Sequence, residues 1–277
     1  MATVQALLHA SADLTTDAPR RDAEILLCHV LQKDRAWLFT WPDKELDAVQ
    51  AQQYLALLDD RRRGTPVAYL VGEREFWSLS LEVTEHTLIP RTETETLVEW
   101  ALELPLPADA SVMDLGTGTG AIALALASER PSWQVSALDK STEAVAVARR
   151  NANRHGLERV TIEPSDWYGA VQAQQYDLVV SNPPYIDPGD PHLSRGDLPF
   201  EPRSALVAQD KGLADIKTII SGAVAHLRPG GWILLEHGYD QAEAVQALLQ
   251  AQGFGRIVTR LDIAGQPRIT GGAMDVE

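Results

Sequence analysis

The feature that most constrains the fold is an apolar run that ends in three closely spaced glycines and continues into a second apolar run, VMDLGTGTGAIALALA at residues 112–127. Gly116, Gly118 and Gly120 lack side chains where the chain has to turn sharply and where a ligand has to approach the backbone. The helix expected from about Ala121 offers unpaired backbone N–H groups in its first turn. The order of strand, glycine loop and helix therefore predicts a nucleotide-type binding loop in an α/β domain.

From about residue 110 onwards, apolar runs and helical stretches alternate along the chain. The runs lie at residues 111–115, 133–138, 159–162, 177–180 and 232–235. Such alternation predicts a doubly wound, Rossmann-like α/β fold, in which a mainly parallel sheet is covered by helices on both faces. Ligands of such sheets bind at the carboxyl ends of the strands, which is where the motifs below occur.

The first 75 residues follow a different, helical pattern. Apolar residues recur at helical spacing after Pro19 and again over residues 46–62. Over residues 77–83 apolar and polar residues alternate, which predicts a strand or hairpin with one buried face. We therefore expect a helical partner-recognition domain over residues 1–75, a connecting hairpin and linker over residues 76–109, and the ligand-binding α/β domain over residues 110–277.

Charge and cysteine content exclude several classes of function. The 39 acidic residues outnumber the 24 basic ones and give a formal net charge of -15, so we expect no stable binding of nucleic acid. The only cysteine, Cys28, excludes an internal disulfide and a thiolate metal cage, and the histidines show no metal-ligand spacing. Since no apolar run reaches the roughly 18 residues of a membrane span, we expect a cytoplasmic protein without membrane or metal.

Two cofactors fit the glycine loop taken by itself. Gly116, Gly118 and Ala121 satisfy the dinucleotide pattern G-x-G-x-x-G/A, so a nicotinamide dinucleotide and S-adenosylmethionine both stay open. Asp139 closes the next strand, where its carboxylate would accept hydrogen bonds from both ribose hydroxyls of either cofactor. Asp114 favours S-adenosylmethionine, because a carboxylate before the first glycine suits a cationic methionine moiety and would repel a pyrophosphate.

A further segment, SDWY at residues 165–168, follows the third apolar run. Asp166 and Trp167 would then lie at the next position around the rim of the pocket. The Trp167 ring could lie against a flat adenine, where stacking contributes roughly 1–3 kcal/mol. Core packing of Trp167 stays open as the alternative.

The stretch SNPPYID, residues 181–187, places an amide, two prolines and an aromatic ring directly after the fourth apolar run. The Asn182 side-chain oxygen and the Pro183 carbonyl can accept both N–H groups of a primary amide or exocyclic amine, so that its nitrogen directs its lone pair at an electrophilic methyl group. Pro184 restricts the direction of that carbonyl, and the Tyr185 ring can stack on the planar substrate group. We expect rate to come from orientation without a titrating base, and a kcat that is flat between neutral and mildly alkaline pH.

Six segments together resemble the release factor glutamine methyltransferases, a family of class I S-adenosylmethionine-dependent enzymes with a helical N-terminal domain. They are IPRTETE (89–95), DLGTGTGAIALALASERP (114–131), SDWY, SNPPYID, FEPRSAL (200–206) and LLEHG (234–238). The resemblance covers nearly the whole chain. It implies methyl transfer to the side-chain nitrogen N5 of the glutamine in the Gly-Gly-Gln loop of bacterial peptide chain release factors, with S-adenosylhomocysteine as the second product. Two departures from the family pattern are Thr92, in place of the usual proline, and the tail IAGQPRITGGAMDVE at residues 263–277.

The resemblance also implies roles for individual residues. The methionine part and ribose of the cofactor would be held by Asp114, Gly116, Thr117, Gly118, Thr119, Gly120 and Asp139. Asp166 and Trp167 would complete the cofactor site on the adenine side, and Asn182 would border cofactor and substrate alike. The substrate glutamine would be held by Asn182, Pro183, Pro184 and Tyr185, of which Asn182, Pro183 and Tyr185 are the candidate catalytic residues.

Other functions stay open as alternatives. Adenine-N6 methyltransferases of nucleic acid carry a similar NPPY stretch, but they need a basic face, and the only run of basic residues is 61–63 at a predicted helix end. A ribosomal protein could replace the release factor as the glutamine substrate. A non-catalytic, partner-binding protein that retains cofactor would leave Asn182 and Tyr185 without a role. An NAD-dependent oxidoreductase is the remaining alternative, and a cofactor titration would distinguish it. Residues 187–204 are expected to form a loop over the site, and Glu236 either supports the pocket or is a paired structural carboxylate.

Overall fold

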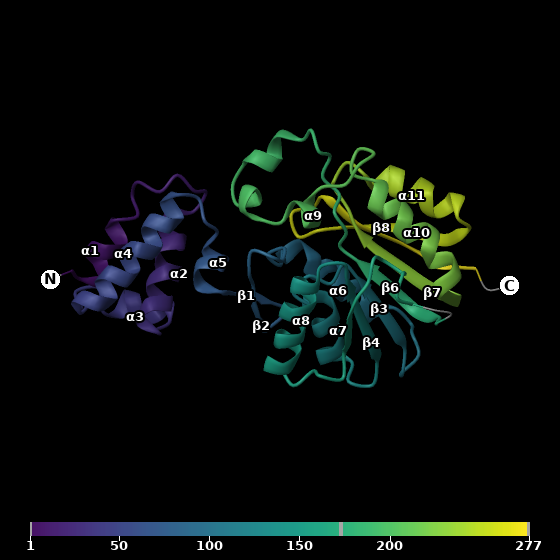
Figure 1. The fold of residues 1–277 in the computed structure, drawn as a ribbon, viewed down its shortest axis with the longest axis horizontal. Coiled ribbons are helices and arrows are strands. Elements are labelled where there is room, and N and C mark those ends of the chain that lie inside the picture. The colour runs from purple at the N-terminus through teal and green to yellow at the C-terminus, as the bar shows by residue number, and fades with distance from the viewer. Residues whose placement is uncertain (1, 172–173, 276–277) are drawn as a thin grey trace. The chain divides into compact units, whose positions relative to one another are not determined.

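The computed structural model describes residues 2–171 and 174–275, and the chain divides into two compact units (Figure 1). The helical unit comprises Met1–Glu73 and Ser194–Phe200, and the sheet unit comprises Arg74–Leu193 and Glu201–Glu277. The helical unit is thus built from two separate stretches of sequence. No helix in the described part of the chain is long and apolar enough to cross a membrane.

In the helical unit, the N-terminal stretch forms short helices around one apolar core. Over the described residues these are α1 (Val4–His9), α2 (Pro19–Leu31), α3 (Arg35–Thr40), α4 (Ala48–Arg62) and α5 (Val67–Val71). Pro19 begins α2, where its missing N–H is not needed, and Asp47 caps α4 through a capping box with Gln50. Leu26 and Leu58 are fully buried in the core. The predicted helical character of this region is confirmed.

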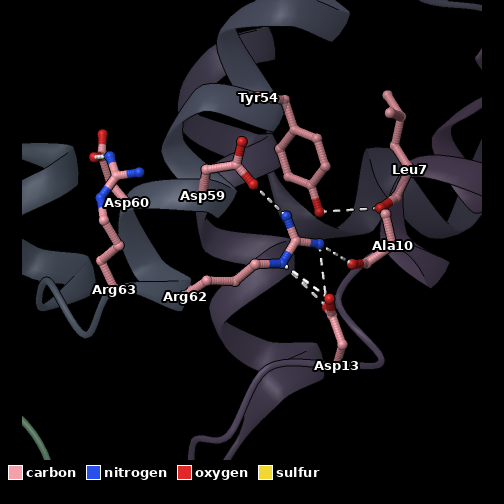
Figure 2. A network of polar contacts seen from close by, with 8 residues as sticks. All are labelled: Leu7, Ala10, Asp13, Tyr54, Asp59, Asp60, Arg62 and Arg63. Carbon is pink, nitrogen blue, oxygen red and sulfur yellow. Dashed lines mark hydrogen bonds and ion pairs between the residues drawn. The ribbon is translucent and has the colours of Figure 1, made fainter.

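Polar contacts add to this core (Figure 2). Tyr54 is fully buried, and its hydroxyl donates a hydrogen bond of 3.1 Å to the carbonyl of Leu7, which joins α4 to α1. Burial raises the pKa of Tyr54 to about 12, so the hydroxyl keeps its hydrogen and remains a donor. Arg62 donates to the carbonyl of Ala10 at 2.8 Å and pairs with Asp13 at 3.1 Å. These contacts hold the loop that follows α1 against α4.

The second stretch of the helical unit, Ser194–Phe200, packs on the end of α4. It contains the last residue of the short helix η2 (Pro191–Ser194) and all of η3 (Leu198–Phe200). The buried Arg61 guanidinium donates to Asp22 at 2.8 Å and to Asp197 at 3.0 Å. Gly64 has a φ of +100°, and a Cβ built on it would lie 2.7 Å from the ring of Phe200. The close packing and the left-handed backbone both require glycine at position 64.

Within the described residues, the sheet unit is built on a seven-stranded sheet with the order β5-β4-β3-β6-β7-β9-β8. The strands are β3 (Ser111–Leu115), β4 (Gln134–Asp139), β5 (Thr161–Pro164), β6 (Tyr176–Ser181), β7 (Leu227–Glu236), β8 (Phe254–Leu261) and β9 (Pro267–Met274). Strands β3 to β7 pair in parallel, and β9 runs antiparallel to both of its neighbours. All five predicted apolar runs overlap strands. The strand order reverses beside β3, and ligand sites of doubly wound sheets form at such a reversal.

Helices cover both faces of this sheet (Figure 1). On one face lie α6 (Glu95–Glu103), α7 (Ala121–Glu129) and α8 (Thr142–Arg154), and on the other lie α10 (Ala214–His226) and α11 (Ala242–Ala251). Leu97 and Leu124 are buried in the first of the two cores, and Ile219 and Leu249 in the second. The predicted doubly wound α/β fold with a helical N-terminal region is therefore confirmed.

A hairpin precedes the sheet, formed by β1 (Glu73–Phe76) and β2 (Leu79–Glu82). Its two turn residues, Trp77 and Ser78, have φ values of 55° and 77°, as a tight hairpin turn requires. The Asn151 side chain of α8 accepts from the N–H of Glu82 at 2.7 Å and donates to its carbonyl at 3.0 Å. The same amide donates to the carbonyl of Thr119 at 2.9 Å. Asn151 therefore ties the hairpin to the glycine loop.

Candidate active site

A cavity of about 410 Å³ lies at the carboxyl ends of the central strands. It is lined by seven of the predicted site residues, Gly116, Gly118, Asp139, Asp166, Trp167, Asn182 and Pro184. A smaller cavity of about 50 Å³ shares Gly116, Gly118 and Asn182 with it. Four segments that are separate in the sequence thus meet at one edge of the sheet, as the α/β pattern predicts.

The glycine loop is held against the neighbouring strand by its backbone. The N–H groups of Gly116 and Thr117 donate to the carbonyl of Leu138 at 2.8 and 2.9 Å. Gly118 has a φ of +56°, and its N–H donates to the Asp139 side chain at 2.8 Å. The left-handed backbone turns this N–H towards the carboxylate, so the loop and Asp139 position each other.

Asp139 lines the cavity at the end of β4. Its Oδ2 atom accepts from Gly118, and its Oδ1 atom accepts from the N–H of Ser141 at 2.9 Å. Burial raises the pKa of Asp139, while the backbone N–H groups oppose that rise. Each carboxylate oxygen keeps a second lone pair, so both can still accept a hydrogen bond from a ligand hydroxyl in the cavity.

Asp114 does not line the cavity, although it is among the predicted cofactor residues. It is fully buried behind the loop, where its Oδ2 atom accepts from the Thr117 hydroxyl at 2.6 Å and from the N–H of Ala123 at 3.2 Å. Its Oδ1 atom has no hydrogen-bond partner among the described residues. Burial raises the pKa of Asp114 to about 7. A positive charge in the adjacent cavity would favour its ionised form, so this carboxylate fits a cationic ligand.

The remaining loop residues have mainly internal roles. Thr117 and Thr119 are buried and line only the smaller cavity. A Cβ built on Gly120 would lie 3.0 Å from Leu124 and 3.3 Å from Ala148, so this glycine allows α7 and α8 to pack closely. Gly120 contributes to the shape of the loop rather than to the cavity wall.

Trp167 is held at the rim by contacts on its backbone and its ring. Its φ is 48°, and its carbonyl accepts from the Ser165 hydroxyl at 2.7 Å. Its ring packs against the core that lies under α10, and Asp215 of that helix lines the same cavity with a pKa that is raised by burial. Asp166 is exposed and pairs with Lys140 at 2.8 Å. Sequence patterns gave no signal for Lys140 or Asp215, because neither belongs to a motif.

Asn182, which lines both cavities, is linked through Thr94 to a buried carboxylate, and Tyr185, which is not among the described residues that line them, contacts the same carboxylate. The Asn182 Nδ2 atom donates to the Thr94 hydroxyl at 3.2 Å, and Thr94 donates to Glu236 Oε2 at 2.7 Å. The Tyr185 hydroxyl donates to Glu236 Oε1 at 3.3 Å, and the Tyr185 carbonyl accepts from Gln241 at 3.0 Å. Burial raises the pKa of Tyr185, so its hydroxyl stays neutral.

The prolines of this segment differ in exposure to the cavity. Pro184 lines the larger cavity, while Pro183 is buried and is absent from the walls of both cavities as far as the described residues define them. Thr94, which the sequence did not single out, belongs to the short helix η1 (Thr92–Thr94) and lines the smaller cavity. It lies within the IPRTETE segment, where Thr92 begins η1.

Buried Glu201 joins the IPRTETE and FEPRSAL segments. Its carboxylate accepts from the N–H of Ile89 at 3.1 Å and pairs with Arg91. The FEPRSAL segment continues into α9 (Arg203–Leu206), and Ser204 and Ala205 line the larger cavity. The two segments thus form one wall of the site. Across the described residues, no group of three or more His, Cys, Asp or Glu side chains could hold a metal ion.

The chain is similar to known proteins along nearly its whole length. Residues 5–72 match the family described as PrmC N-terminal domain, and residues 94–194 match the family described as Methyltransferase small domain. The release factor glutamine methyltransferase of Xylella fastidiosa is 51% identical over 94% of this chain and 95% of that protein. The protein of the same description from Pseudomonas aeruginosa is 50% identical over 98% of each chain.

The fold is also similar to that of solved methyltransferases. The 16S rRNA N2 G1207 methyltransferase of Thermus thermophilus, solved with S-adenosylmethionine and guanosine, has a TM-score of 0.51 at 20% identity. The match covers 73% of this chain and 49% of that chain. At this identity the likeness shows the fold alone.

Proposed function

Because the chain belongs to the family of release factor glutamine methyltransferases, we propose that its site transfers the methyl group of S-adenosylmethionine to the side-chain nitrogen N5 of the glutamine in the Gly-Gly-Gln motif of peptide chain release factors. The observation that carries the proposal is the orientation of Asn182. Its Nδ2 atom is engaged by Thr94, so its Oδ1 atom is the one left to accept a hydrogen bond at the cavity that it shares with the glycine loop.

The residues around the cavity fit the cofactor. Its volume of about 410 Å³ lies within the roughly 300–1,000 Å³ of small-molecule sites. Asp139 would hold the ribose hydroxyls, the loop from Gly116 to Gly118 would allow close approach of the methionine part, and Trp167 would lie against adenine. The raised pKa of Asp114 would fall as a cation binds beside it. When bound, S-adenosylmethionine supplies an electrophilic methyl group on a positively charged sulfur and leaves as S-adenosylhomocysteine.

The substrate amide would be oriented rather than activated by a base. Asn182 Oδ1 would accept one N–H group of the glutamine side chain, and the carbonyl of Pro183 would accept the other. The Tyr185 ring would lie against the planar amide. With both hydrogens held, the nitrogen lone pair is directed at the methyl group, and the surplus proton leaves the nitrogen after transfer. The rate then depends on how well these acceptors are positioned.

The helical unit would serve in recognition of the release factor, and the reaction would take place in the cytoplasm. Nucleic acid is disfavoured as a substrate because the basic run at the end of α4 is already paired. Arg61 pairs with Asp22, and Arg62 pairs with Asp13. With a net charge of -15, the chain offers little attraction to a phosphate backbone.

A labelling experiment tests the proposal. The purified protein is incubated with radiolabelled S-adenosylmethionine and, in separate reactions, a bacterial release factor, the same factor with its motif glutamine replaced, and duplex DNA. Label on the intact factor alone is expected. Label on the substituted factor would exclude this glutamine as the acceptor, and label on DNA would favour an adenine-N6 methyltransferase.

A further inference from the structure

Three side chains that are far apart in the sequence, Asn182, Thr94 and Glu236, are hydrogen-bonded in series from the cavity wall into the protein interior. Thr94 lies between them, 3.2 Å from the Asn182 amide on one side and 2.7 Å from the Glu236 carboxylate on the other. Thr94 is 4% exposed and Glu236 is 1% exposed, so water does not compete for these contacts. Thr94 and Asn182 both line the smaller cavity. We infer that Thr94 and Glu236 are positioning residues that fix which end of the Asn182 amide faces the substrate, an inference that rests on the proposed function.

The direction of each hydrogen bond follows from which of the three side chains carries a hydrogen to donate. An ionised carboxylate has none, so the Thr94 hydroxyl has to give its only hydrogen to Glu236. The Thr94 oxygen can then only accept, and only the Nδ2 end of Asn182 can donate to it. The reversed amide would set two oxygens against each other with no hydrogen between them. The Oδ1 end of Asn182 is therefore directed away from Thr94 and remains available to a ligand.

The orientation of the Asn182 amide decides whether this side chain can bind the substrate. The side-chain nitrogen of glutamine carries two hydrogens, so it needs an acceptor from Asn182. A reversed Asn182 would offer its own NH₂ group, and two donors facing each other repel. Asparagine alone has no means of preferring one of its two nearly isosteric orientations, and its partners have to impose it. Thr94, which lines the smaller cavity, and the buried Glu236 supply that preference.

The protonation state of Glu236 determines the direction of the hydrogen bonds that link Glu236, Thr94 and Asn182. The charged and titratable groups facing it are Arg268 of β9, Glu93 of η1 and the Tyr185 hydroxyl. Burial raises the pKa of Glu236 to about 7, although Thr94, Arg268 and Tyr185 oppose the rise. A protonated Glu236 can donate to Thr94, whose hydrogen is then free to turn towards Asn182 and to accommodate the reversed amide. Methyl transfer should therefore weaken as the pH falls below about 7 and stay flat above it.

The test uses two substitutions at one position. Thr94→Val keeps the shape and removes the hydroxyl, and Thr94→Ser restores the hydroxyl. We expect Thr94→Val to lower kcat at about pH 8 by about 10- to 100-fold while the Kd for S-adenosylmethionine stays within about threefold. Thr94→Ser should recover most of the rate. Thr270→Val is the matched control, since Thr270 is equally buried and its hydroxyl contacts His237 at 2.7 Å outside the cavity; its kcat should match that of the wild type.

A second readout does not depend on catalysis. The side-chain amide signals of Asn182 in the free protein, followed by NMR, should shift with the titration of Glu236 in the wild type and should lose this dependence in Thr94→Val. An unchanged kcat in Thr94→Val, an equal loss in Thr94→Ser, or amide signals that titrate alike in both proteins would overturn the inference. A wild-type protein that methylates no release factor would instead contradict the proposed function, and the NMR titration would still decide the role of Thr94.

Discussion

The side chain of Asp139 accepts a hydrogen bond of 2.8 Å from the backbone N–H of Gly118. The residue proposed to hold the ribose therefore also holds the glycine loop in its left-handed turn. Contacts to the cofactor and the shape of the loop are coupled through one carboxylate. Replacing Asp139 should for this reason affect cofactor binding more than the loss of ribose contacts alone.

We expect Asp139→Ala to weaken S-adenosylmethionine binding by about 2–4 kcal/mol, because it removes the ribose acceptors and leaves two backbone N–H groups without a partner. Asp139→Asn keeps one acceptor oxygen and should lose less. Isothermal titration calorimetry measures both affinities. Glu103→Gln is the control, since this exposed carboxylate pairs with Arg260 at 2.6 Å away from the cavity. Equal affinities for Asp139→Ala and the wild type would exclude Asp139 from the cofactor site.

Asn182→Ala should separate catalysis from cofactor binding. The substitution removes an acceptor for the substrate and no contact proposed for the sulfonium, so kcat should fall by more than about tenfold, from a loss of roughly 2–4 kcal/mol, while cofactor affinity is nearly unchanged. Steady-state kinetics with a release factor, together with calorimetry, measures the two effects. Asn153→Ala on the exposed face of α8 is the matched control and should retain full activity. A variant at position 182 that keeps its rate would contradict the orientation mechanism.

Glu236 should make the folded protein less stable as the pH rises. Its pKa is about 7 in the folded protein against an ordinary value of 4.5, so the folded state binds more protons than the unfolded state between these two values. Its contribution to the free energy of unfolding is present below about pH 4.5 and is lost as the pH rises through about 7. Glu236→Gln removes this dependence.

The comparison is made by thermal melting of both proteins between about pH 5 and 8. Relative to the wild type, Glu236→Gln should gain about 1–3 kcal/mol across this range, or several degrees in melting temperature. The difference between the two curves removes the contributions of other groups, such as His237, whose pKa is lowered by burial. Parallel curves would mean that Glu236 titrates in the folded protein as it does in the unfolded chain.

Gly64→Ala should destabilise the helical unit more than Gly72→Ala does, although both glycines have a left-handed backbone. Gly72→Ala is the matched control, because Gly72 has a φ of +80° but a Cβ there has nothing within 4 Å. Both changes impose backbone strain of about 1 kcal/mol, whereas Gly64→Ala also forces the Phe200 ring to move. Hydrogen exchange should show faster opening of residues 194–200 in Gly64→Ala only. Equal hydrogen-exchange rates of residues 194–200 in the two variants would show that the Phe200 ring moves aside without a loss of stability.

The central strands could be predicted because each is an apolar run buried on both faces. The antiparallel end of the sheet could not. β8 mixes buried and exposed residues, and β9 contains Gly271 and Gly272, which are poor signals for a strand. A Cβ on Gly271 would lie 2.4 Å from Leu234 and 2.9 Å from Trp100, so tertiary packing explains the glycine. Residues 267–274 of the divergent tail form an interior strand between β7 and β8, and residues 276 and 277 of that tail lie outside the described residues.

The residues of the site could likewise be predicted only where they belong to contiguous motifs. The glycine loop and the NPPY segment are contiguous motifs, and the structure brings Gly116, Gly118, Asp139, Trp167 and Asn182 together at one cavity, as the sequence predicted. Asp114 was predicted beside the ligand but lies behind the loop, because its side chain is directed to the start of α7. Thr94 and Glu236 are 142 residues apart, and nothing in the local sequence of either indicates that they meet.

The return of the chain to the helical unit at Ser194–Phe200 limits how this protein can be divided. A fragment that ends at Glu73 would lack Asp197 and Phe200, and so would leave Arg61 with one of its two acidic partners and expose the surface around Gly64. Recombination between relatives at a single crossover near residue 73 would separate these partners into different parents. A working chimera would have to inherit both stretches from the same parent, so the two are expected to evolve as one module despite the 120 residues between them.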